Sequence, residues 1–267
     1  MLEKVRCNLC NSSYDSLKYI KNDFRIVRCR CGLVYVNPRK EIEYDKSYFS
    51  RKGSVYEDYL EERNLKKKNF RRLIKDIKKL TFSEKKKLLD IGCGTGEFLE
   101  VAKENGYEVK GVEISEFAVG YCSGKHLCVD IGDFDKIDIK EKFDIVTMFD
   151  FIEHSKDPFK DLRKVNEILD ENSLLVVVTG NIDSWFAKLM GRKWNFLNPE
   201  EHLYYFSEKT LRKMLNKAGF GVIKIKKDFR YVSFNNFFRY FKVNLKFGRF
   251  SFLVWLPSMM VVFARKK

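Results

Sequence analysis

Three closely spaced glycines mark the segment with the clearest chemical potential. Gly92, Gly94 and Gly96 follow a short apolar run, 88–91, and precede an amphipathic stretch, which predicts a strand that turns tightly into a helix. Their G-x-G-x-G spacing differs from the G-x-G-x-x-G pattern of pyrophosphate sites. Asp90 and the glutamate after the last glycine place carboxylates on both sides of the turn. These charges would repel a pyrophosphate and favour a ligand with a cationic centre.

A further acid follows the next predicted strand. Glu113 lies 23 residues after Asp90, at the end of the predicted strand 108–113. A carboxylate at that position can accept hydrogen bonds from both hydroxyls of a ribose. The two features together predict a cationic nucleoside ligand without a phosphate, a description that fits S-adenosylmethionine.

Apolar runs alternate with amphipathic stretches from residue 88 onward. The predicted strands are 88–91, 108–113, 127–131, 143–148, 174–179, 222–226 and 259–264. The predicted helices are 98–104, 115–123, 157–169 and 208–218. This alternation predicts an α/β fold, with a largely parallel sheet and helices on both faces.

The glycine segment resembles motif I of the class I S-adenosylmethionine-dependent methyltransferases. The resemblance covers residues 85–267 and implies a Rossmann-like, seven-stranded sheet whose last strand is antiparallel. It implies that the glycines hold the methionine part of the cofactor, that Glu113 holds the ribose and that Asp133 lies near the adenine. The cofactor-binding residues expected on this basis are Asp90, Gly92, Gly94, Gly96, Glu113 and Asp133.

Two of the three histidines follow predicted strands of the sheet. A Glu-His pair ending at His154 and a Pro-Glu-Glu-His-Leu stretch containing His202 resemble the methyltransferase branch that acts on sugars and other small metabolites. A histidine can serve as general base near neutral pH, and we expect His154 in that role, with His202 as the second candidate. The alternative is that His154 only orders its loop.

The same loop carries a possible metal-binding pattern. Asp150, Glu153 and His154 resemble the Glu-x-x-Glu-His segment that binds a divalent metal in ubiquinone-biosynthesis O-methyltransferases and small-RNA 2′-O-methyltransferases. With His202 these side chains could hold Mg²⁺ or Mn²⁺. The sequence favours general-base chemistry over this metal site.

Four of the seven cysteines form two close pairs near the start of the sequence. Cys7 and Cys10 are separated by 18 residues from Cys29 and Cys31. In a reducing compartment this spacing predicts one tetrahedral Zn²⁺, and four protein ligands make such a site structural. The segment resembles the zinc ribbon in front of many small-molecule methyltransferases, including sugar C-methyltransferases.

The chain is basic, with 52 Lys and Arg against 37 Asp and Glu, a net charge of +15. Twelve of these cations lie in 63–87, where an apolar stripe predicts a surface helix. The segment 229–255 interleaves aromatic and basic residues and is expected to form a lid over the substrate. Alternatives are a peripheral membrane contact through 229–255 and nucleic-acid binding through either segment.

The sequence therefore predicts three parts: a zinc-ribbon module at 1–40, a charged helical linker at 41–84, and the methyltransferase domain with its aromatic insertion. The expected function is methyl transfer to a small molecule, with a nucleotide-linked sugar or surface-polysaccharide precursor as the favoured acceptor. The alternatives are an rRNA or tRNA methyltransferase and a non-catalytic adaptor. The lack of a signal-peptide-like or membrane-spanning stretch predicts a cytoplasmic location.

Overall fold

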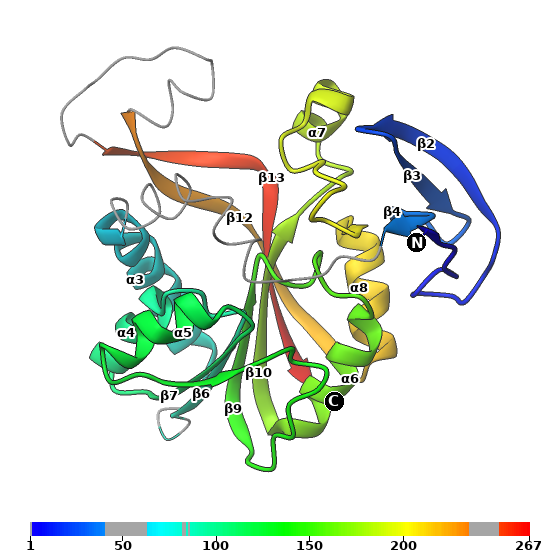
Figure 1. Cartoon of the computed structure of the whole chain (residues 1–267). Coiled ribbons are helices and arrows are strands. Elements are labelled where there is room, and N and C mark those ends of the chain that lie inside the picture. Colours follow the sequence, from blue (N-terminus) through cyan, green and yellow to red (C-terminus); the bar gives the residue numbers. More distant parts are fainter. Residues whose placement is uncertain (1, 41–62, 82–83, 85, 235–250) are drawn as a thin grey trace.

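A seven-stranded sheet forms the centre of this computed structural model, which describes residues 2–40, 63–81, 84, 86–234 and 251–267 (Figure 1). The strand order is β12–β13–β10–β9–β6–β7–β8. The strands are β6 (Lys87–Ile91), β7 (Glu108–Glu113), β8 (Cys128–Ile131), β9 (Phe143–Phe149), β10 (Leu169–Gly180), β12 (Phe220–Ser233) and β13 (Ser251–Lys266). Strands β6 to β10 pair in parallel, whereas β13 runs antiparallel to β10 and β12. The predicted Rossmann-like sheet with an antiparallel last strand is confirmed.

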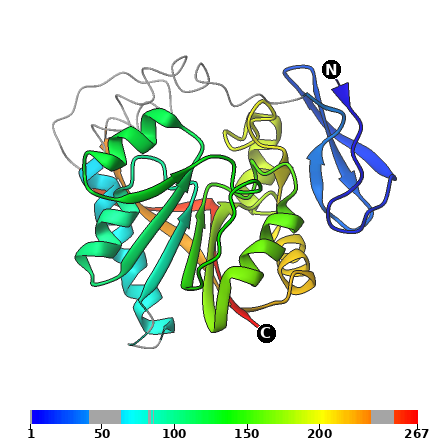
Figure 2. The same cartoon turned by 60° about the horizontal axis from the view of Figure 1, so that its bottom comes forward.

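Helices cover both faces of the sheet (Figure 1 and Figure 2). One layer holds α3 (Arg63–Leu80), α4 (Glu97–Glu104) and α5 (Glu116–Ser123), and the other holds α6 (Pro158–Ile168) and α8 (Glu208–Lys217). The centre of strand β10, residues 174–178, is continuously apolar because both of its faces are buried. Val176 and Val178 belong to the core under the first layer, while Leu175 and Val177 belong to the core under the second. Side chains that alternate between two buried faces favour an apolar residue at every position of this run.

The last two strands are longer than the sequence predicts. The predicted strands at 222–226 and 259–264 extend in the structure into a hairpin that pairs Phe229 with Trp255 and Ser233 with Ser251. Both ends of the predicted aromatic insertion are therefore strands, and the hairpin projects beyond the sheet (Figure 1). Aromatic side chains suit a half-buried pleated surface, and those at the two ends of this segment lie in strands. Residues 235–250, the centre of the predicted lid, lie outside the described residues.

The basic helix α3 packs its apolar stripe against the domain, as predicted. Ile74 and Ile77 are fully buried. Its cations meet an acidic face of α4, where Arg63 and Lys67 both contact Glu100. Burial raises the pKa of Glu100, but hydrogen bonds from these cations and from Lys125 lower it to about 2. Part of the local positive charge is therefore neutralised inside the fold. The linker residues 41–62 are not among those described.

The N-terminal segment forms a small antiparallel sheet of β2 (Asp15–Lys21), β3 (Phe24–Cys29) and β4 (Val34–Val36). A fourth strand, β11 (Tyr204–Tyr205), pairs with β4 and comes from the methyltransferase half of the chain. A separate two-residue pair joins β1 (Leu2–Glu3) to β5 (Arg39–Lys40). Residues far apart in the sequence thus complete one sheet beside α8 (Figure 1).

A short helix, α7 (Trp185–Met190), and a 3₁₀ turn, η1 (Gly191–Lys193), follow β10. Within the described ranges, none of the helices combines the length and apolar composition that a membrane crossing requires. The carboxyl ends of the parallel strands meet at one edge of the sheet, which is where open α/β folds place their ligands.

Candidate functional site

The glycine turn joins β6 to α4 in a conformation that needs glycine. Gly92 and Gly96 have φ values of 73° and 80°. A Cβ on Gly92 would lie 2.9 Å from the ring of Phe151, and a Cβ on Gly96 would lie 2.6 Å from Leu127 Cδ1. Phe151 therefore leaves no room for a side chain at Gly92, and Leu127 leaves none at Gly96.

Glu113 ties this turn to the end of the neighbouring strand β7. Its carboxylate accepts hydrogen bonds of 2.9 Å from the backbone N–H of Gly94 and of 2.9 Å from that of Ser115. The side chain is only 7% exposed. Burial raises the pKa of Glu113, while the backbone N–H groups oppose that rise. The carboxylate thus stabilises the turn, and it also borders a cavity.

Two cavities open along this edge, and they share Gly92 and Asp150. The first, of about 290 Å³, has walls that include Gly92, Glu113, Asp133, Phe151, His154 and Asp161. The second, of about 280 Å³, has walls that include Phe70, Asp90, Gly92, Phe149, Lys226 and Arg230. Four of the six predicted cofactor residues therefore line a cavity. Gly94 and Gly96 line neither cavity; their positive φ values shape the turn that carries Gly92.

Asp90 is a buried acid at the end of β6. It is 2% exposed, and the hydroxyl of Thr147 donates a 2.6 Å hydrogen bond to its Oδ1. Burial raises the pKa of Asp90 to about 8, the hydrogen bond from Thr147 opposes this, and the charge of Glu113 adds to it. In the absence of a cationic ligand, the carboxyl group is therefore mostly protonated at neutral pH.

Asp150 lies between the two cavities with a φ of 48°. Its carboxylate is 3.6 Å from the guanidinium of Arg230 on β12, and Arg230 Nε lies 2.6 Å from Asp228. The sequence did not single out Arg230 or Phe151. Arg230 is one cation among several in the aromatic segment, and only the pairing of β12 with β13 directs it to this edge.

The two histidines named from the sequence come together. The rings of His154 and His202 are 4.6 Å apart, centre to centre. The Nδ1 atom of His154 lies 3.0 Å from the carbonyl of Glu201, and that of His202 lies 2.6 Å from the carbonyl of Phe196. A ring nitrogen that faces a carbonyl must carry a proton, so each neutral imidazole keeps its lone pair on Nε2.

Glu153 is the third member of this group. It is completely buried, its Oε2 accepts a 2.9 Å hydrogen bond from Thr179, and its Oε1 has no hydrogen-bond partner among the described residues. Potential ligand atoms of Glu153, His154 and His202 all lie within 4.8 Å of one another. Asp150, the first residue of the predicted metal-binding pattern, is not in this group and pairs instead with Arg230. Burial, followed by the charge of Asp150, raises the pKa of Glu153.

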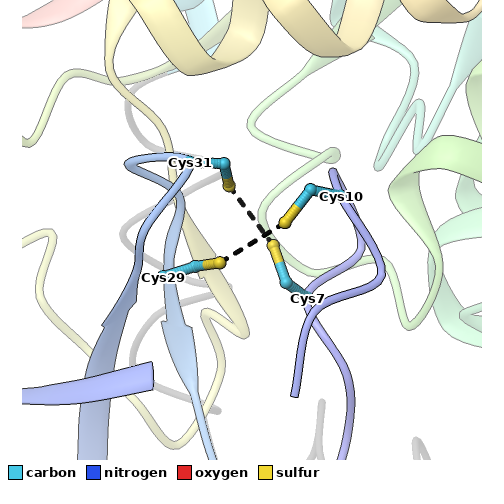
Figure 3. Close-up of side chains that lie close together, drawn as sticks. All are labelled: Cys7, Cys10, Cys29 and Cys31. Carbon is cyan, nitrogen blue, oxygen red and sulfur yellow. Dashed lines mark hydrogen bonds between the residues drawn. The ribbon is translucent and has the colours of Figure 1, made fainter. Parts of the chain in front are cut away.

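The four N-terminal cysteines converge on one point (Figure 3). Cys7 Sγ lies 3.5 Å from Cys31 Sγ, and Cys10 Sγ lies 3.4 Å from Cys29 Sγ, with all four sulfurs within 4.8 Å of one another. Bonds of about 2.3 Å to a tetrahedral Zn²⁺ would hold sulfurs about 3.8 Å apart. The arrangement therefore fits a metal ion of that size and geometry. The single residue between Cys29 and Cys31 does not prevent this.

Comparison with known proteins identifies the fold family. Residues 64–225 match the family model described as the methyltransferase domain, which is more than half of the chain. The chain belongs to the methyltransferase domain family. This match confirms the methyltransferase prediction at the level of the family.

Individual curated relatives of this methyltransferase share about 30% of their residues with it over less than half of the chain. A ubiquinone biosynthesis O-methyltransferase from Bradyrhizobium diazoefficiens is 30% identical over 146 residues, which is 47% of this chain and 58% of that protein. One from Rhodopseudomonas palustris is 30% identical over 117 residues, 42% of this chain and 46% of that protein. The chain thus spans about half the length of these curated relatives.

Solved structures show the same fold. A S-adenosylmethionine-dependent methyltransferase from Archaeoglobus fulgidus is 26% identical, with a TM-score of 0.57 over 79% of this chain and 100% of that one. One from Thermotoga maritima is 21% identical, with a TM-score of 0.58 over 82% of this chain and 98% of that one.

The buried acid at the end of β6 generates a prediction about pH and stability. The pKa of Asp90 is about 8 in the folded chain, against about 3.9 for an unfolded aspartate. Between these values the folded state keeps a proton that the unfolded state releases, so this residue's contribution to the free energy of unfolding falls as pH rises from about 4 to about 8. Asp90→Asn should remove that contribution.

The measurement is urea unfolding of the cofactor-free protein at several pH values between 5 and 8. The Asp90→Asn variant should gain stability relative to wild type as pH rises. Asp138→Asn, at a side chain that is 79% exposed, is the control and should follow the wild-type profile. Parallel profiles for all three proteins would contradict the assignment of a buried, protonated Asp90.

Proposed function

We propose that this protein transfers the methyl group of S-adenosylmethionine to a nucleophile on a small molecule. The observation that carries the proposal is the pair of cavities that meet at Gly92 and Asp150, one bordered by Glu113 and Asp133 and the other by Asp90. The first suits the adenosine part of the cofactor, because Glu113 can accept hydrogen bonds from ribose hydroxyls. The second suits the cationic amino acid part.

The cofactor supplies an activated methyl group on a sulfonium. The residues of the chain have three tasks around it: to bind, to align the acceptor and to exclude water. Phe151 covers Gly92, and the aromatic residues Phe70 and Phe149 line the second cavity. We assign removal of a proton from the acceptor to the Nε2 atom of His154, since its Nδ1 atom faces the Glu201 carbonyl.

A small-molecule acceptor is supported by the names of the curated relatives, which refer to O-methylation in ubiquinone biosynthesis. The segments around His154 and His202 support a nucleotide-linked sugar or surface-polysaccharide precursor within that class. RNA is less well supported, because several cations of α3 pair with acids of α4. We propose the cytoplasm as the site of this reaction.

The cofactor assignment predicts a specific effect of Glu113→Ala. Loss of charged hydrogen bonds to the ribose should weaken binding by ~1–3 kcal/mol. Titration calorimetry with S-adenosylmethionine measures this, and Glu116→Ala, at a nearby exposed position, is the control. Equal affinity for wild type and Glu113→Ala would remove Glu113 from the binding site. No binding by the wild type would overturn the proposed function.

The acceptor and the base are tested together. Labelled methyl transfer is first compared between a metabolite extract and total RNA, and we expect label in the metabolites. With the acceptor in hand, His154→Ala should reduce turnover ~10²-fold with little change in cofactor affinity. His126→Asn, at the exposed third histidine, is the control. Incorporation only into RNA would favour the RNA methyltransferase.

A divalent ion is the competing explanation for the same histidines. Glu153, His154 and His202 would hold it, and the buried Oε1 of Glu153, which has no hydrogen-bond partner in the described part of the chain, is compatible with that role. Loss of turnover with a chelator and recovery with Mg²⁺ or Mn²⁺ would favour the ion over the general base.

We propose that the four-cysteine centre holds one structural Zn²⁺. Four thiolates leave no open coordination position, so the ion stabilises the N-terminal module. Freshly reduced protein should contain about one zinc per chain by metal analysis, and Cys10→Ser should lose it. Cys128→Ser, at an exposed cysteine outside the cluster, should keep the metal. Absence of zinc from the reduced wild type would reject the site.

A further inference from the structure

The four-cysteine module, residues 2–40, contacts the methyltransferase domain at the loop that borders the first cavity. Asn8 lies between Cys7 and Cys10, inside the first cysteine pair. Its Nδ2 donates a 2.7 Å hydrogen bond to Asp157, and its Oδ1 accepts a 2.9 Å hydrogen bond from the backbone N–H of Phe159. The side chain of Asn8 thus makes two hydrogen bonds to residues that lie 149 and 151 positions later in the sequence.

These contacts complete the amino-terminal cap of α6. Asp157 is the N-cap residue and accepts a 3.0 Å hydrogen bond from the N–H of Lys160. The N–H of Phe159, in the same first turn, is capped by Asn8 instead. A helix start leaves several N–H groups without partners in the helix, and capping of one by a side chain stabilises it. Here the cap is divided between the helix's own residue and the cysteine module.

The same cap is continuous with the wall of the cavity. The N–H of Asp157 donates to the hydroxyl of Ser155 at 3.1 Å, and that hydroxyl donates to the carboxylate of Asp161 at 2.5 Å. All three residues line the cavity that contains Glu113 and Asp133. A displacement of Asp157 therefore changes the groups that face the cofactor.

A second contact holds the neighbouring peptide. Arg39, at the end of the module, donates a 2.9 Å hydrogen bond to the carbonyl of Lys156. Tyr204 donates to the same carbonyl at 3.2 Å. The module thus holds the loop on both sides of Asp157, at the peptide before it and through Asn8.

We propose that Asn8 is a positioning residue through which the four-cysteine module holds the wall of the cofactor cavity. This inference rests on the proposed function for its effect on cofactor binding. The cysteine cluster fixes the backbone on both sides of Asn8, so a metal-loaded module presents the side chain in one place. Asn8 touches neither cofactor nor acceptor and acts through Asp157 and Phe159.

The experiment uses the full, zinc-loaded chain and the variant Asn8→Ala. Hydrogen–deuterium exchange over 152–162 should increase about tenfold in the variant, because the cap of Phe159 is lost. Affinity for S-adenosylhomocysteine by calorimetry should fall about three- to tenfold. Zinc content and the exchange of β6 and β9 should stay as in the wild type. A purely structural role in the module would change zinc content or melting temperature and leave 152–162 and affinity unchanged.

Lys213→Gln is the matched control. It removes a 3.5 Å contact from α8 to the carbonyl of Cys31, which joins the module to the domain away from the cofactor loop. Exchange over 152–162 should not change in this variant. If Asn8→Ala loses zinc, Arg39→Gln, outside both cysteine pairs, should still raise exchange over 152–162 and lower affinity.

Unchanged exchange over 152–162 in zinc-loaded Asn8→Ala, or in Arg39→Gln where the first variant has lost zinc, would overturn the inference. Increased exchange with unchanged affinity would also overturn it. A wild type that binds no S-adenosylhomocysteine would instead refute the proposed function, and the exchange measurement would still decide whether Asn8 holds the loop.

Discussion

The hydrogen bond from the Gly94 backbone to the Glu113 carboxylate is the interaction on which the site depends. It joins the turn after β6 to the end of β7, two strands that are neighbours in the sheet. A buried carboxylate is costly unless N–H groups satisfy it, and two backbone N–H groups do so here. The turn can therefore keep its positive φ values and its close contact with Phe151 while the carboxyl group of Glu113 borders the first cavity.

Ion pairs lie on two sides of the cavities, between α3 and α4 and around Arg230. On the α3 side, cations from the linker region meet the acids of α4, so a strongly basic stretch of sequence becomes a packed interface. At the open edge, Arg230 lies between Asp150 and Asp228 and connects the last hairpin to the loop after β9. The net positive charge of the chain is thus a poor guide to what it binds, because many cations have partners within the fold.

Much of the fold could be predicted from sequence because its signals are local. The glycine turn and the apolar run of β10 each depend on a few neighbouring residues, and the four cysteines form two pairs that each span three or four residues. The position of Asp150 could not be predicted in this way. Its spacing to His154 suggests a shared metal, but the residue that decides its direction is Arg230, about eighty positions later. Likewise, the aromatic residues of 229–255 predict a covering segment. In the structure, residues 229–233 of β12 pair with residues 251–255 of β13 and are strands.

The pairing of β4 with β11 has a consequence for the order in which the chain can acquire its structure. The first forty residues leave the ribosome early, yet the edge of their sheet is completed by Tyr204 and Tyr205, which are synthesised more than 160 residues later. Long-range pairing of this kind is slow to form. During synthesis, the edge of β4 remains open and the cysteine loops lack the support of Asp157 and α8. Binding of the proposed Zn²⁺ by the four cysteines would order this segment before its partner strand exists.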